Sequence, residues 1–173
     1  MIILIGGASH TGKTALSQKL MERHSIPYLS IDHLKMGLIR SGQTNLTASD
    51  DAPLTPYLWN IVKEIIKTAI ENKQSLIIEG CYIPFDWQKD FGADYLSEIK
   101  FFCLVMSQSY IEKNFDDIIG FENVVERRLE KGCVSKTRLI EENLYNLEEC
   151  KKYNLDYILI DGSFNLEELM VGH

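Results

Sequence analysis

Five short segments of the chain consist almost entirely of aliphatic and aromatic residues. They are Ile2–Ile5, Tyr28–Ile31, Leu76–Ile78, Phe101–Val105 and Tyr157–Ile160. Their apolar residues are nearly continuous rather than alternating with polar ones, which is typical of parallel strands that are covered on both faces. The pattern therefore predicts five buried parallel strands.

Amphipathic helices are expected between these strands. The clearest follows Thr55, which we expect to cap the helix, with Pro56 at its first position. Its apolar face repeats at helical spacing and comprises Leu58, Ile61, Val62, Ile65, Ile66 and Ala69. A second helix is predicted from Ser135 towards Tyr153, with an inward face of Ile140, Leu144 and Leu147. Such alternation of strands and helices predicts an α/β fold with right-handed crossovers.

Two stretches fit this alternation poorly. Ser41–Pro53 is polar and rich in turn-forming residues, and Asn114–Lys136 has few apolar residues at either period. Long irregular insertions in compact domains are often lids or binding loops, and the alternative is an ordinary surface loop. No internal repeat, low-complexity tract or linker divides the sequence, so we expect residues 1–173 to form one domain.

Composition narrows the class of protein. A chain of 173 residues can form one domain that buries roughly 70% of its unfolded surface. Its net charge of −7 argues against a nonspecific nucleic-acid or anionic-membrane surface. The apolar run Met1–Ile5 is too short for a signal-peptide core, and no run reaches the roughly 20 apolar residues of a membrane span. We therefore expect a cytoplasmic protein without a nucleic-acid or membrane partner.

The four cysteines are widely spaced and include no C-x-x-C pair. They are Cys81, Cys103, Cys133 and Cys150. This spacing favours four free thiols over a disulfide framework or a zinc site.

The segment between the first strand and the first helix matches G-x-x-x-x-G-K-[ST] in full. Its residues are Gly7, Ala8, Ser9, His10, Thr11, Gly12, Lys13 and Thr14. A hydrophobic strand before the motif and a helix after it are the context that a phosphate-binding loop requires. The alternative, a glycine-rich turn that is followed by chance by Lys-Thr, does not account for this context.

The residue types of this loop suit a polyphosphate. Glycines let successive backbone N–H groups converge on an anion, and the N-terminus of the following helix adds its dipole. Lys13 is expected to contact the β- and γ-phosphates, and the Thr14 hydroxyl is expected to bind Mg²⁺. We expect His10 to be a spacer on the solvent side. The loop therefore predicts ATP and Mg²⁺ as cofactors.

Further motifs indicate which class of phosphate-binding protein this is. A GTPase would need N-K-x-D, and the only Asn-Lys pair lacks the aspartate. Together with the compact size, four stretches resemble the nucleoside-monophosphate-kinase-like group of P-loop kinases. They are GASHTGKT at 7–14, LSIDHLKMGLIR at 29–40, LIIEGCYIP at 76–84 and VVERRLEKG at 124–132. The Asp-His-Leu-Lys-x-Gly stretch is most similar to 2-phosphoglycerate-kinase-like and other hydroxyl-phosphorylating branches.

This resemblance implies a three-layer α/β P-loop fold. Its five-stranded parallel sheet should have the strand order 2-3-1-4-5. A helical lid is expected at about 114–136, and a segment on the acceptor side at about 32–55. ATP is the implied phosphoryl donor.

Two carboxylates are expected near the phosphates. Asp32 follows the second strand, and ligands of open α/β sheets bind beyond the carboxyl ends of the strands. Asp32 is therefore a candidate for orienting or deprotonating the acceptor hydroxyl, the alternative being a helix N-cap. Glu79 follows the third strand, where related kinases hold Mg²⁺ through water. The alternative for Glu79 is a structural ion pair.

The resemblance assigns further residues to the acceptor and the donor. Lys35 and Arg40 lie where the family grips the anionic part of the acceptor, although each could be plain surface charge. Tyr82 is expected to shape the acceptor wall, and Ser163 belongs to a loop that would pass the adenine.

The lid is expected to supply positive charge. Arg127 and Arg128 are candidates for stabilising the charge on the transferring phosphoryl group. The alternative is a solvated helix face.

These observations favour an ATP- and Mg²⁺-dependent kinase that phosphorylates a hydroxyl of a small, anionic metabolite. The catalytic candidates are Lys13, Asp32, Arg127 and Arg128. One alternative is a nucleoside or nucleoside-monophosphate kinase of the adenylate-kinase-like type. Another is a nucleotide-binding regulatory module without turnover. The sequence makes no prediction about the oligomeric state.

Overall fold

The computed structural model describes residues 1–120 and 135–162, which include a five-stranded sheet. Its strands are β1 (Ile2–Gly7), β2 (Tyr28–Ser30), β3 (Leu76–Glu79), β4 (Ile99–Met106) and β5 (Tyr157–Ile160). All four pairs of neighbouring strands are parallel, and the order is β2-β3-β1-β4-β5. The predicted sheet and its strand order are confirmed.

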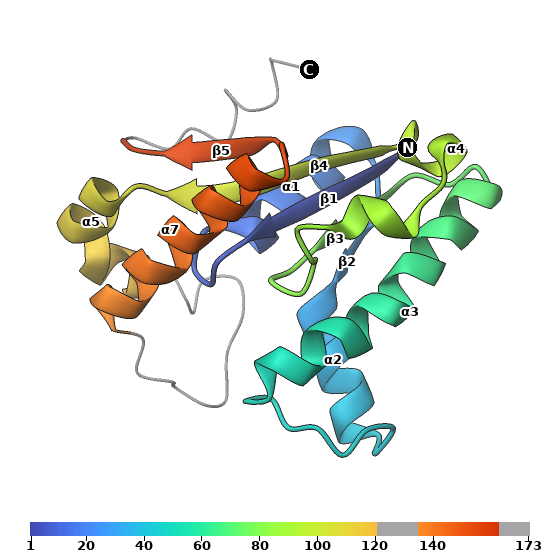
Figure 1. Ribbon diagram of the computed structural model, residues 1–173, viewed down its shortest axis with the longest axis horizontal. Coiled ribbons are helices and arrows are strands. Elements are labelled where there is room, and N and C mark those ends of the chain that lie inside the picture. Colours follow the sequence, from blue (N-terminus) through green and yellow to red (C-terminus); the bar gives the residue numbers. More distant parts are fainter. Residues whose placement is uncertain (121–134, 163–173) are drawn as a thin grey trace.

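Helices cover both faces of this sheet (Figure 1), with α7 in front of it and α1 behind it in that view. The α-helices are α1 (Lys13–His24), α2 (Ile31–Arg40), α3 (Asp51–Glu71), α4 (Ala93–Leu96), α5 (Gln108–Gly120) and α7 (Lys136–Lys152). A short 3₁₀-helix, η1 (Trp87–Asp90), follows β3. In the described part of the chain, no helix combines the length and the apolar character that a membrane crossing requires.

Each face of the sheet has its own apolar core. Successive strand residues point to opposite faces, so Leu4 packs in a core with α3 and η1, whereas Ile5 packs in a core with α1 and α5. Both side chains are fully buried. Burial of a large aliphatic side chain contributes about 1.5–3 kcal/mol. The two cores explain why the strands read as continuous apolar runs.

The third helix begins earlier than the sequence predicts. Asp50 is at its N-cap, so Thr55 and Pro56 lie inside α3 rather than at its start. The backbone N–H of Thr47 donates to the Asp50 carboxylate at 2.7 Å and the Thr47 hydroxyl does so at 2.8 Å. These two bonds lower the pKa of Asp50. Thr55 instead donates its hydroxyl to the carbonyl oxygen of Asp51 at 3.0 Å.

The predicted irregular segment at 114–136 is partly helical. Helix α5 continues to Gly120, and Asn114 is the one residue inside it with non-helical dihedral angles. Phe115 and Ile118 pack in the core behind the sheet, so their burial keeps this part of the chain helical. The remainder, 121–134, lies outside the described residues.

The predicted helix after Ser135 is confirmed, and two of the three residues expected on its inward face, Ile140 and Leu147, pack against the cores, whereas Leu144 does not. The Ser135 hydroxyl caps α7 by accepting the N–H of Arg138 at 3.1 Å. Leu144 is 43% exposed. The buried residues of α7 are Leu139, Asn143 and Cys150. The polar Asn143 belongs to the inward face, which shifts that face away from Leu144.

Substitution of Gly7 tests whether β1 must end in a glycine. The φ of Gly7 is 139°, and a Cβ atom at this position would lie 2.6 Å from the carbonyl oxygen of Leu104. We expect Gly7→Ala to lower the free energy of unfolding by about 2–4 kcal/mol, because a backbone segment must shift and the dihedral angles are strained. Unfolding in urea measures this change.

Gly37→Ala is the matched control for this experiment. Gly37 lies inside α2, and a Cβ atom there would meet nothing within 4 Å. Alanine should therefore raise the free energy of unfolding by about 0.5–1 kcal/mol. Equal stability of the two variants would show that β1 can end without a glycine.

Candidate active site

The predicted phosphate-binding loop connects β1 to the N-terminus of α1. His10 and Gly12 adopt left-handed dihedral angles, with φ of 65° and 86°, and Gly12 is the N-cap of α1. The Thr11 hydroxyl donates to the carbonyl oxygen of Ala8 at 2.9 Å, which closes the loop on itself. A helix of 12 residues that starts here directs its first backbone N–H groups and its dipole towards the loop.

Lys13 is buried inside this loop, with only 6% of its surface exposed. Its ammonium group donates to the carbonyl oxygen of Ala8 at 2.7 Å. Burial by itself lowers the pKa of Lys13, but Cys81, Glu79 and Asp32 outweigh it, so the pKa is raised. Lys13 therefore carries a positive charge at neutral pH.

The two predicted Mg²⁺ ligands lie together. The Thr14 hydroxyl donates to Oε1 of Glu79 at 3.2 Å. Glu79 is the last residue of β3, is 1% exposed, and lies between Ile5 of β1 and Ser30 of β2 in the sheet register. The hydroxyl and carboxylate oxygens fit Mg²⁺, which usually takes one or two protein carboxylates together with water and phosphate oxygens.

No denser metal site is present in the part of the chain that the structure describes. Three or more His, Cys, Asp or Glu side chains arranged to hold a metal ion do not occur among the described residues. A Mg²⁺ ion held by Thr14 and Glu79 would therefore depend on phosphate oxygens for part of its coordination.

Asp32 lies in the first turn of α2. The sequence predicts that the strand extends to Ile31, but Ile31 is already the first residue of this helix. Ser30 is the N-cap of this helix, so the alternative interpretation of Asp32 as the N-cap is not supported. The Asp32 carboxylate forms an ion pair with Lys35 at 2.6 Å. Because Asp32 is one of the groups that raise the pKa of Lys13, the structure brings Lys13, Glu79 and Asp32 together.

Lys35 is held by a network of side chains from α2, the start of α3 and the segment after β3. Besides its ion pair with Asp32, it donates to the Tyr82 hydroxyl at 3.0 Å and lies 5.0 Å from the centre of that ring. The Tyr82 hydroxyl donates to Oδ1 of Asp51 at 2.8 Å. Burial, followed by this bond to Asp51, raises the pKa of Tyr82. Arg40 is exposed in the last turn of α2 and does not join this network.

Three predicted site residues lie outside the described residues. They are Arg127 and Arg128 of the expected lid and Ser163 of the expected adenine loop. Just before Ser163, Asp161 accepts a hydrogen bond from the Ser107 hydroxyl, which lowers the pKa of Asp161. This bond ties the end of β5 to the start of α5.

Sequence reasoning missed two members of the site. Cys81 is the group that does most to raise the pKa of Lys13, and the Asp51 carboxylate accepts a hydrogen bond from the Tyr82 hydroxyl. Cys81 directly follows the E-G element at the end of β3, so its position gave a usable signal. Asp51 gave none, because its partner is 31 residues away along the chain.

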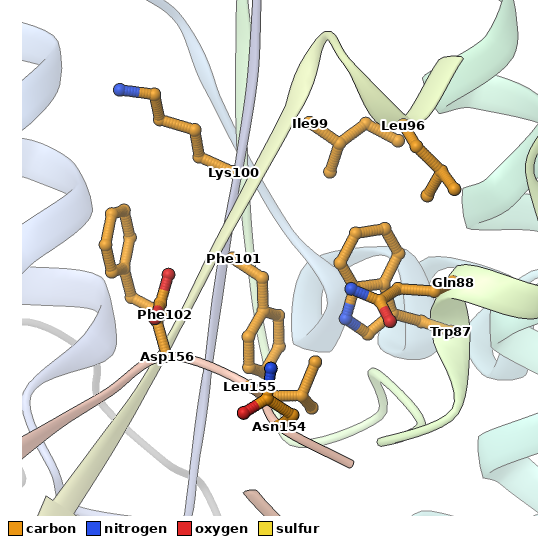
Figure 2. A pocket seen from close by; sticks show the side chains of 10 residues that line it. All are labelled: Trp87, Gln88, Leu96, Ile99, Lys100, Phe101, Phe102, Asn154, Leu155 and Asp156. Atoms are coloured by element: carbon orange, nitrogen blue, oxygen red, sulfur yellow. The ribbon is translucent and has the colours of Figure 1, made fainter. Parts of the chain in front are cut away.

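A cavity of about 300 Å³ lies at the opposite edge of the sheet. Figure 2 shows Trp87, Phe101 and Leu155 among its lining. In the register of β1 and β4, Ile99 of this lining pairs with Ile2, whereas Leu104 pairs with Gly7 of the phosphate-binding loop. The cavity is therefore not part of the candidate active site.

Comparisons with known proteins find similarity in structure alone. No family model matches the sequence, and no curated protein does. A gluconokinase from Sinorhizobium meliloti 1021 superposes with a TM-score of 0.57 at 15% identity, over 96% of this chain and 85% of that chain.

Two shikimate kinases give similar values. The protein from Aquifex aeolicus vf5 has a TM-score of 0.54 at 16% identity, over 97% of this chain and 90% of that chain. The protein from Bacteroides thetaiotaomicron has a TM-score of 0.57 at 13% identity, over 97% and 93%. These similarities show that the chain has the three-layer α/β fold of P-loop kinases. The narrower resemblance to 2-phosphoglycerate kinases stays a prediction.

Tyr82→Phe tests the network around Lys35. It removes the hydroxyl that joins Lys35 to Asp51, and we expect the free energy of unfolding to fall by about 1–2 kcal/mol. Tyr57→Phe is the control, because the Tyr57 hydroxyl makes one exposed bond of 3.3 Å to Gln43. Its effect should stay below about 0.5 kcal/mol. Equal effects in urea unfolding would contradict a structural role of the network.

The raised pKa of Tyr82 adds a dependence on pH to this test. The folded protein keeps the phenol protonated above its ordinary pKa of 10, whereas the unfolded chain loses the proton there. The stability of the original protein should therefore fall more steeply above pH 10 than that of Tyr82→Phe. Parallel slopes would show that Tyr82 ionises normally.

Proposed function

We propose that the protein is an ATP- and Mg²⁺-dependent kinase that transfers the γ-phosphoryl group to a hydroxyl of a small metabolite. The observation that carries the proposal is the convergence of Lys13, the Thr14–Glu79 pair and Asp32 at one edge of the sheet. The likeness in fold to a gluconokinase and to shikimate kinases supports the proposal. A module that only binds nucleotide would not need Asp32 beside the phosphates.

Each group has a defined role in this reaction. The loop amides and Lys13 bind the β- and γ-phosphates, and Thr14 and Glu79 would hold Mg²⁺, which neutralises phosphate charge when it is bound. Asp32 orients the acceptor hydroxyl and takes its proton as the oxygen attacks the γ-phosphorus. The bond from that phosphorus to the bridging oxygen breaks, and ADP leaves. Lys35 fixes the orientation of the Asp32 carboxylate.

The remaining assignments are also part of the proposal. Arg127 and Arg128 are proposed to stabilise the charge of the transferring phosphoryl group, and Ser163 to belong to the adenine loop. The expectation of an anionic acceptor depended on Lys35 and Arg40. Lys35 is paired with Asp32, whereas Arg40 is exposed at the end of α2, so the proposed contact with an anionic acceptor would depend on Arg40.

Lys13→Ala is the direct test of the phosphate-binding loop. In a coupled assay of ADP release over sugars, polyols, hydroxy acids and nucleoside monophosphates, we expect kcat/KM to fall at least about 100-fold, because charge stabilisation is lost. Lys19→Ala, on the exposed side of the same helix, should leave the rate unchanged. Retained turnover in Lys13→Ala would refute the role of Lys13. Turnover with AMP, CMP or dTMP alone would favour the nucleoside-monophosphate kinase.

Glu79→Gln tests the proposed metal site. The substitution keeps the size of the side chain but removes its charge, so we expect the Mg²⁺ concentration for half-maximal activity to rise about 10- to 100-fold. Glu22→Gln, an exposed substitution on α1, is the control. If Glu79→Gln left the dependence of the rate on Mg²⁺ unchanged, Glu79 would have only a structural role.

A further inference from the structure

A second cavity, of about 360 Å³, lies against the phosphate-binding loop. Gly6 and Gly7 of β1 contribute to its lining, as do Cys81, the segment 83–86 and residues of α7. Figure 1 shows α7 and the segment after β3 on the same side of the sheet. The volume lies within the roughly 300–1,000 Å³ of small-molecule sites.

This cavity adjoins the atoms that the proposed reaction uses. Cys81 lines it and is one of the groups that raise the pKa of Lys13. Gly7, the first residue of the phosphate-binding loop, also lines it. A molecule in the cavity would therefore lie beside the start of the phosphate-binding loop, although Lys13, Thr14 and Glu79 do not line the cavity.

The cavity combines two carboxylates with neutral polar groups, which include the hydroxyls of Thr55, Tyr145 and Tyr153. Asp86, Glu149 and Asn146 contribute to its lining, and none of the described residues that line it is a lysine, an arginine or a histidine. Asp86 pairs with Lys89, and Glu149 pairs with Lys152 at 2.8 Å, but both lysines are largely exposed and neither lines the cavity. A ligand carboxylate in this part of the cavity would therefore lie near two carboxylates, and no described residue of the lining would offer it a cation.

Aromatic side chains complete the lining. Phe85 and Tyr145 meet edge to face, with ring centres 5.9 Å apart, and so join the segment after β3 to α7. Phe101 and Tyr153 also line the cavity. Aromatic faces pack on the C–H groups of a ligand, and carboxylates and amides accept hydrogen bonds from its hydroxyls. This combination suits a molecule with many hydroxyls and no charge.

We propose that the phosphoryl acceptor is an uncharged sugar or polyol that binds in this cavity and extends from it to Asp32, with Glu149 and Asn146 determining its specificity. The inference rests on the proposed function. It also departs from the anionic acceptor that the sequence favours.

Matched pairs of acceptors test the proposed class. Glucose and gluconate, or glycerol and glycerate, share hydroxyls and differ in a carboxylate. In the assay of ADP release we expect kcat/KM to be at least about tenfold higher for the neutral member, because the carboxylate of the other member would lie near Asp86 and Glu149. A tenfold difference corresponds to about 1.4 kcal/mol. Equal or higher kcat/KM for the carboxylates would overturn the inference and leave the kinase proposal intact.

Glu149→Gln tests the residue, with Glu148→Gln as the matched control on the same helix. Glu148 is exposed and does not line the cavity. We expect Glu149→Gln to raise the KM for the neutral acceptor several-fold, to narrow the preference over its carboxylate partner, and to leave the KM for ATP unchanged. Glu148→Gln should change none of these values. An unchanged preference in Glu149→Gln would contradict the role of Glu149.

Calorimetry separates failure of the inference from failure of the proposed function. Glucose, glycerol and their carboxylates are titrated into the protein loaded with a non-hydrolysable ATP analogue and Mg²⁺. Binding of a neutral member that Glu149→Gln weakens, without ADP release in the assay, would support the cavity and refute the kinase. Binding of the carboxylates alone, or of no member of the panel, would overturn the inference.

Discussion

The burial of one ammonium group is the constraint that organises this site. An ion removed from water costs several kcal/mol unless it is paired and hydrogen-bonded. Lys13 meets this requirement through the Ala8 carbonyl at 2.7 Å and the nearby Glu79 and Asp32. The conformation of the loop and the position of the two carboxylates therefore depend on the same charge. Phosphate oxygens would add to this compensation, which gives the loop its proposed affinity for a nucleotide.

The parallel sheet supplies the geometry that this compensation needs. Thr14 and Glu79 are 65 positions apart in sequence, yet their side chains are in contact. Contact is possible because β3 lies between β1 and β2, so that Glu79 aligns with Ile5 and Ser30. The helix that follows Ser30 then begins at the same edge and carries Asp32 in its first turn. Strand order, rather than any local motif, brings these residues together.

The fold was predictable from the sequence where the signal was local and strong. Buried parallel strands form continuous apolar runs, and the phosphate-binding loop is a contiguous motif. The inward face of α7 was predictable only in part, because Asn143 interrupts its apolar period: Ile140 and Leu147 pack against the cores, whereas Leu144 does not. The Asn143 side chain accepts the N–H of Met106 at 2.8 Å, so a polar residue is buried for a hydrogen bond to β4. An apolar pattern then assigns Leu144 inward, although it is exposed.

The sequence also does not show which charged side chains of the site are already paired. A sequence shows that Lys35 is positive, but only the structure shows that Asp32 and Tyr82 already occupy its ammonium group. On the other side, Lys89 and Lys152 pair with Asp86 and Glu149 while lying outside the cavity that these carboxylates line. The charge that an acceptor would meet is therefore set by where each ion pair forms. For the described residues, that arrangement favours hydroxyl groups over a carboxylate.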